Sequence, residues 1–128
     1  MRYLILIYSE EPTSPPPAAR LAEVGAAYGA YTGMLRDRGA FLGGDELQPT
    51  ATSTTIRVRD GQTLITDGPF TESREWIAGL AILECADLDE AIEQALRHGM
   101  AYEGRLEIRP IHSMGGPEDH RAASRTTG

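Results

Sequence analysis

The sequence predicts a single α+β domain, and three observations support this prediction. Residues 3–8 and 77–85 are apolar on both alternating faces, which is typical of strands that are covered on both sides. Residues 15–38 and 88–98 repeat apolar side chains every three or four positions, as amphipathic helices do. The Asp-Gly dipeptide at 60–61 separates two alternating segments and indicates a β-hairpin. A chain of 128 residues has room for one such domain.

The first strand, residues 3–8, precedes a proline-rich stretch in which we expect Ser14 to cap a helix that begins at Pro15. Gly39 is expected to end this helix, because glycine readily adopts the left-handed conformation found there. One face of the helix carries an apolar stripe that we expect to pack on the sheet. The members of this stripe are Leu21, Val24, Tyr28, Tyr31 and Leu35.

A short second strand, residues 40–44, leads into the hairpin of residues 55–59 and 62–66. A two-residue turn at Asp60-Gly61 requires a positive φ at both residues and fixes the register of the two hairpin strands. The predicted partners are Arg59 with Gln62, Val58 with Thr63, and Ile56 with Ile65.

The second helix follows the strand at residues 77–85. Asp87 and Glu90 form an acidic version of a capping box at its start, and Gly99 lies near its end. Its inner stripe is predicted to contain Leu88, Ala91, Ile92, Ala95 and Leu96.

The last strand, residues 105–111, alternates in polarity. If Leu106 and Ile108 face the helices, Glu107 and Arg109 face the opposite side of the sheet. A guanidinium there needs an acidic partner or a bound anion. Two interpretations of Arg109 stay open: an ion pair with Glu107 or an acid of a second chain, and a contact with a bound carboxylate, enolate or phosphate.

The order of these elements corresponds to a ferredoxin-like βαββαβ fold with an added β-hairpin. Two helices can cover only one face of a four-stranded sheet, yet the first and third strands are apolar on both faces. An apolar sheet face left in water marks a partner surface. We therefore expect a homodimer in which two sheets stack face to face and form a dimeric α+β barrel.

Composition narrows the class of protein. The net charge of −7 argues against a nucleic-acid partner, which needs a positive field. The lone Cys85 cannot form an internal disulfide, so we expect a cytoplasmic protein with a buried, unreactive thiol. The apolar start is too short to span a membrane, so no membrane partner is expected. We expect one domain at residues 1–112 and a disordered tail at residues 113–128.

The block Asp-Gly-Pro-Phe-Thr-Glu-Ser-Arg-Glu at residues 67–75 resembles the signature of the DGPF family, whose usual form is DGPFAETKE. This family belongs to the YCII-related proteins, and the resemblance spans residues 1–112. It implies a ferredoxin-like fold, dimeric association and a cleft for a small molecule, without specifying an activity. The other matching segments are YLILIY at 3–8, AAYGAYTGMLRDRGAFLGGDELQP at 26–49, TTIRVRDGQTLITDGPF at 54–70 and LEIRPI at 106–111.

In the wider YCII-related group, a His on the first helix and a downstream Asp are proposed as an acid–base pair. Tyr28 occupies the position that corresponds to this His, and no matching Asp is recognisable around Arg97-His98-Gly99. The proposed pair therefore does not carry over to this sequence.

Asp67 and Glu72 are the candidate catalytic carboxylates. Two carboxylates in a partly apolar site acquire different pKa values, so one can act as a general acid and the other as a general base. Arg109 is the third catalytic candidate, as the residue that would hold negative charge on the substrate. The alternative for Asp67 is structural, because a carboxylate at this point can accept hydrogen bonds from its own turn.

Six further side chains are candidate ligand contacts, although the tyrosines are also compatible with a core, Arg57 with a solvated hairpin face and His98 with a helix end. These residues are Tyr8, Tyr28, Arg57, Phe70, Trp76 and His98. The histidines lack metal-ligand spacing and no nucleotide-binding loop is present, so no metal or cofactor is expected.

The leading functional hypothesis is a homodimer that binds a small molecule in a cleft between sheet and helices. One alternative is a cofactor-independent enzyme that catalyses elimination, isomerisation or rearrangement of a small anionic or aromatic metabolite. A second alternative is an accessory or regulatory partner of an RNA polymerase sigma factor, because some relatives are encoded next to or fused with one.

Overall fold

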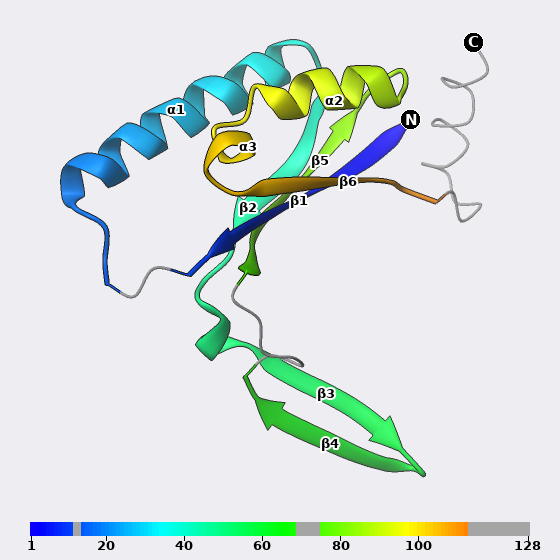
Figure 1. The fold of residues 1–128 in the computed structure, drawn as a ribbon. Coiled ribbons are helices and arrows are strands. Elements are labelled where there is room, and N and C mark those ends of the chain that lie inside the picture. Colours follow the sequence, from blue (N-terminus) through cyan, green and yellow to red (C-terminus); the bar gives the residue numbers. More distant parts are fainter. Residues whose placement is uncertain (12–13, 69–74, 113–128) are drawn as a thin grey trace.

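The computed structural model describes residues 1–11, 14–68 and 75–112. An antiparallel four-stranded sheet carries the helices on one face, and a two-stranded hairpin projects from one end of the domain (Figure 1). The sheet has the order β2-β5-β1-β6, which is compatible with the expected ferredoxin-like arrangement. Its strands are β1 (Arg2–Glu10), β2 (Phe41–Glu46), β5 (Glu75–Glu84) and β6 (Arg105–Pro110). The other elements are α1 (Ala18–Asp37), η1 (Thr50–Thr52), β3 (Thr54–Arg59), β4 (Gln62–Asp67), α2 (Leu88–Leu96) and α3 (Met100–Glu103).

The hairpin has the predicted register. Ile56 pairs with Ile65, and the other two predicted pairs are also present. Asp60 and Gly61 have φ values of 51° and 77°, as a two-residue turn of the predicted kind requires. The sequence therefore predicted both the turn and the strand pairing correctly.

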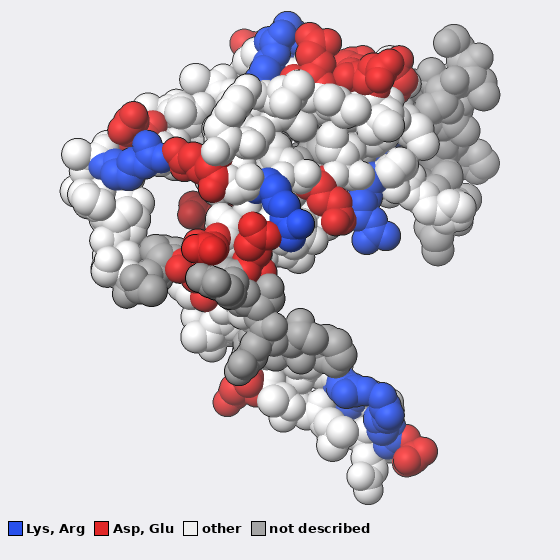
Figure 2. All heavy atoms as spheres, in the orientation of Figure 1, with Lys and Arg blue, Asp and Glu red and all other residues white. Residues whose placement is uncertain are grey.

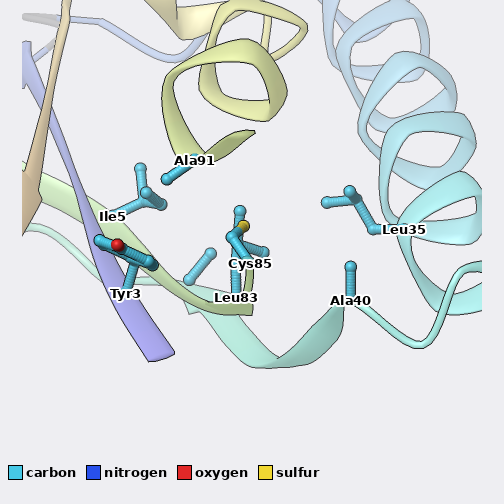
Figure 3. Packing of buried hydrophobic residues seen from close by; sticks show 8 residues of the cluster. Tyr3, Ile5, Leu35, Ala40, Leu83, Cys85 and Ala91 are labelled. Atoms are coloured by element: carbon cyan, nitrogen blue, oxygen red, sulfur yellow. The ribbon is translucent and has the colours of Figure 1, made fainter. Parts of the chain in front are cut away.

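The helix-side face of the sheet forms the core. Tyr3 lies opposite Leu83 and Ile5 lies opposite Ala81, and all four are buried. Leu35 of α1 and Ala91 of α2 close over them (Figure 3). The buried cluster consists of Tyr3, Ile5, Leu35, Ala40, Ala81, Leu83, Cys85 and Ala91. Burial raises the pKa of the Cys85 thiol to about 11, which keeps it protonated and in keeping with the expected unreactive cysteine.

The opposite face of the sheet is open. Leu4 lies opposite Ile82 and Leu6 lies opposite Leu80, and these four side chains are only half-buried. Figure 1 shows α1, α2 and α3 on the other side of the sheet. Arg109 pairs with Leu4, whereas Leu106 and Ile108 pack against the core. The predicted alternation of the last strand is therefore confirmed.

The start of α1 differs from the prediction. The helix begins at Ala18, and Pro17 precedes it in an extended conformation with φ −58° and ψ 147°. A residue that precedes a proline avoids the helical region, so Pro15 and Pro16 cannot be helical and the helix starts only after the last proline. Ser14 consequently caps nothing. The end is as expected, since Gly39 has a φ of 69° directly after the helix.

The second helix is capped as predicted, but its inner face is different. The Asp87 side chain accepts a hydrogen bond from the Glu90 backbone N–H at 2.9 Å, and Glu90 in turn accepts one from the Ala86 N–H. Ala91 and Ala95 are buried as expected. Three members of the predicted stripe are instead 41–54% exposed, because Gln94 takes the buried position between the alanines. The exposed residues are Leu88, Ile92 and Leu96.

Within the described residues, no helix has the length and apolar character that a bilayer crossing requires.

Candidate ligand site beneath the first helix

The first half of α1 extends beyond the sheet that its second half covers (Figure 1). Leu35 is fully buried, but three residues of the same stripe are not: Leu21 is 56%, Val24 43% and Tyr28 36% exposed. The expectation that the whole stripe packs on the sheet is therefore wrong for its first half. Figure 2 shows an opening between this overhanging half and the body of the domain. We use the name overhang hollow for the uncovered apolar surface that Leu21, Val24 and Tyr28 form on this part of α1.

A buried aromatic and polar cluster lies where α1 meets the end of α2. The His98 side chain is only 8% exposed. Its ring stands edge-to-face against Tyr31 at 5.1 Å between centroids and against Tyr28 at 6.0 Å. The Tyr31 hydroxyl donates a hydrogen bond to the Gln94 carbonyl oxygen at 3.1 Å. The helix contact thus places Tyr28, Tyr31, Gln94 and His98 together, and we call these four residues the His98 cluster.

The hydrogen bonds of His98 define its protonation state. The Met100 backbone N–H donates to His98 Nδ1 at 3.0 Å, so a neutral ring carries its proton on Nε2. Burial lowers the pKa of His98, which favours this neutral form near pH 7. The neutral His98 ring therefore presents an N–H donor at Nε2 and carries no positive charge.

Two buried polar atoms of this cluster have no partner within the described part of the chain. They are His98 Nε2 and Gln94 Oε1, and the Gln94 side chain is 3% exposed. Buried polar atoms in proteins are nearly always hydrogen-bonded, so this donor and this acceptor are available to pair with a water or a ligand. Because an amide can turn over, Gln94 can present either its oxygen or its nitrogen.

The edge of β2 near Tyr28 is acidic. Burial is the main cause that raises the pKa of the Tyr28 hydroxyl, and the carboxylate of Asp45 is the second cause. Glu46 acts in the same direction, whereas Arg36 opposes it. The Arg36 guanidinium lies over the Phe41 ring, 4.9 Å from its centroid. The field around Tyr28 therefore contains more negative than positive charge.

A second concavity lies at the end of the sheet, near the base of the hairpin, with a volume of about 240 Å³. The Glu11 carboxylate at its edge accepts hydrogen bonds from the backbone N–H and hydroxyl of Thr50, at 2.6 and 2.9 Å. Trp76, one of the expected ligand contacts, forms part of its wall. The lining residues are Ser9, Glu11, Glu46, Leu47, Gln48, Pro49, Trp76, Ile77 and Ala78.

The predicted site residues lie in several separate places. Tyr28 and His98 come together in the His98 cluster, on the helix side of the sheet. Tyr8 and Arg109 both lie on the open face, and Arg57 and Asp67 lie in the hairpin. Trp76 belongs to the end concavity. The remaining candidates, Phe70 and Glu72, lie outside the described residues.

Three contributors were not predicted from the sequence. Gln94 and Tyr31 complete the His98 cluster. The sequence signal for Gln94 was its position on the second helix between two alanines of the buried stripe. On the open face, the Arg105 guanidinium lies 5.1 Å from the centroid of the Tyr8 ring and forms an ion pair with Glu75 at 2.7 Å. This ion pair joins strands that are distant in sequence, so no local pattern indicated it.

The described ranges contain no group of three His, Cys, Asp or Glu side chains that could hold a metal ion.

Comparison with known proteins places the chain in a family. A family model described as the YCII-related domain matches residues 1–115. The chain belongs to the YCII-related family. An uncharacterized protein of Rhizobium meliloti (strain 1021) is 39% identical over 67 residues, which cover 51% of this chain and 54% of that protein. The chain thus spans about half the length of this curated relative. The YCII-related resemblance noted in the sequence is confirmed.

Proposed function

We propose that this YCII-related protein is a homodimer that binds a small molecule in the overhang hollow, with the polar end of the ligand at the His98 cluster. One observation carries the ligand proposal: two polar atoms that are more than nine-tenths buried, His98 Nε2 and Gln94 Oε1, have no partner among the described residues. A ligand that pairs with both atoms removes the cost of burying them unpaired, about 1–3 kcal/mol for each group.

The dimer is proposed from the open face of the sheet. Leu4, Leu6, Leu80 and Ile82 form a continuous apolar strip there, because each pairs with another member across β1 and β5. Stacking two such strips around a twofold axis gives the dimeric α+β barrel expected from the sequence. In that arrangement Arg109, next to Leu4, would face the second copy.

Binding is tested with isotope-labelled protein and a library of small fragments, with amide chemical shifts as the readout. We expect the shifts to cluster on residues 21–31 of α1 and on residues 94–100, and Tyr28→Ala to weaken them. Tyr102→Ala is the matched control, because Tyr102 is 79% exposed on α3 and belongs to neither site. Shifts confined to the end concavity around Trp76 would refute the location.

The dimer is tested by sedimentation equilibrium. We expect Leu6→Asp to convert a dimer into a monomer without unfolding it, because an unpaired carboxylate buried at the interface is costly. Tyr102→Asp adds the same charge on the helix side and should leave the dimer intact. A wild-type chain that stays monomeric at high micromolar concentration would remove the dimer from the proposal and leave the ligand site untouched.

A further inference from the structure

We infer that the His98 cluster selects an uncharged planar group that carries a hydrogen-bond acceptor beside a donor, of the carboxamide or lactam class, attached to an apolar body. This inference rests on the proposed ligand site and adds the chemical class of the ligand. It disfavours the small anions that the position of Arg109 suggested from the sequence.

The unpaired atoms define the polar half of the ligand. His98 Nε2 offers one N–H donor, and Gln94 Oε1 offers one acceptor. Gln94 lies in the last turn of α2 and His98 follows two residues after its end, and Tyr31 contacts the backbone carbonyl of the first and the ring of the second. A carboxamide presents a carbonyl oxygen and an N–H group on adjacent atoms, which matches one donor and one acceptor. A carboxylate presents acceptors only, so it would pair with both residues only after the Gln94 amide had turned its nitrogen toward the ligand.

The charges around the cluster also disfavour an anion. Asp45 and Glu46 act on Tyr28 from the edge of β2. On α1, Arg20 forms an ion pair with Glu103, and the side chain of Arg36 is stacked on Phe41. Burying an anion beside neutral His98 would cost solvation without a cation to restore it.

The basic side chains of the last strand lie on the wrong face of the sheet for this site. Arg105 and Arg109 pair with Tyr8 and Leu4 on the open face, whereas His98 lies on the helix side. The sheet itself therefore separates these guanidinium groups from the ligand. Arg97 is also close to the cluster in sequence, but its guanidinium forms an ion pair with Glu93 at 3.3 Å and donates a hydrogen bond to the Met34 sulfur.

The overhang hollow supplies the apolar half of the site. Leu21 and Val24 lie on the side of α1 that faces the core further along the helix, but 56% and 43% of their surfaces remain exposed. The Tyr28 ring continues this apolar surface up to His98. An aromatic or aliphatic body placed there would cover side chains that the sheet does not reach.

Three probes of nearly equal shape test the class directly: benzamide, benzoate and benzamidinium. Each is titrated into the labelled full chain, with the amide shifts of residues 94–100 and the His98 side-chain nitrogen signals as readouts. We expect benzamide to bind about tenfold more tightly than either charged probe, which corresponds to about 1.4 kcal/mol. Gln94→Met keeps the length and removes the amide, so it should abolish the preference for benzamide.

The Gln94→Met variant should remain at least as stable as the wild-type chain, because it replaces an unpaired buried amide with an apolar side chain. If Gln94→Met loses the preference for benzamide but keeps its stability, Gln94 acts as a ligand contact and not as a structural residue. Benzoate binding at His98 as tightly as benzamide would overturn the inference and support the proposed site. A benzamide preference that survives Gln94→Met, or the failure of all three probes to shift residues 94–100, would also overturn it. The fragment library independently decides whether the site itself stands.

Discussion

The two halves of α1 carry the same apolar stripe but lie in different surroundings. In the second half, Leu35 is 0% exposed and packs on the core formed by the sheet. In the first half, Leu21 occupies the same face of the helix and is 56% exposed. The difference shows that a helical pattern specifies which face is apolar, whereas the reach of the sheet decides how much of that face is covered. The uncovered part is available for a ligand.

The largest expected effect comes from truncating the same residue type in each half. Leu35→Ala should lower the free energy of unfolding by about 2–5 kcal/mol, because it opens a cavity in a fully buried position. Leu21→Ala should change it by less than about 0.5 kcal/mol, because the side chain is mostly in water. Urea denaturation of both variants measures the contrast. Equal losses would show that the first half is covered in solution.

The sequence predicts those features of the fold that depend on interactions between residues close together in the chain. The turn at Asp60-Gly61, the cap at Asp87 and the alternation around Arg109 depend on neighbouring residues and were predicted correctly. The start of α1 was misplaced because consecutive prolines act on the residues before them, which outweighed the capping tendency of Ser14. The burial of Leu21 was misjudged because it depends on how far a sheet formed by distant segments extends.

The candidate site was only partly predictable for the same reason. Tyr28 and His98 were named from the sequence, but their contact depends on the packing of α1 against the end of α2. Gln94 was missed, since a polar residue inside an apolar stripe has no meaning until its side chain is found buried and unpaired. The separation of Arg109 from this site follows from the face of the sheet on which it lies, and that consequence required the position of the helices.

A glycine substitution near the middle of α1 sharpens the comparison, with a smaller effect of opposite sign on the free energy of unfolding. A Cβ atom added at Gly29 would have nothing within 4 Å, although the recurrence of glycine on this helix could have indicated close packing. Gly29→Ala should therefore raise the free energy of unfolding by up to about 1 kcal/mol through helix propensity alone. Thermal unfolding measures this, and destabilisation would mean that another surface covers the helix at this point.

The pH dependence of stability tests the burial of His98, which lies where the end of α2 meets α1. Because the pKa of His98 is lowered in the folded chain, the unfolded chain takes up a proton more readily as the pH falls below about 6.5, the ordinary value for histidine. Stability is then retained above this pH and lost as the pH decreases. His98→Gln should reduce the slope between about pH 7 and pH 5, measured by urea denaturation. His112→Gln, at an exposed position, is the control. Parallel profiles for wild type and His98→Gln would contradict the assignment.

The smallest expected effect concerns the contact that holds the overhanging half of α1 in place. The Arg20 guanidinium near its first turn forms an ion pair with Glu103 of α3, and a longer one with Glu23 at 3.7 Å. Exposed ion pairs contribute little to global stability, so Glu103→Gln should leave the unfolding midpoint unchanged. Local opening is a different quantity, and amides in the first turns of α1 should exchange hydrogen faster in this variant. Glu23→Gln removes only the pair within the helix and should have less effect. If hydrogen exchange is the same in all three proteins, then the first half of α1 is held by contacts other than this ion pair, and the overhang hollow keeps its shape without it.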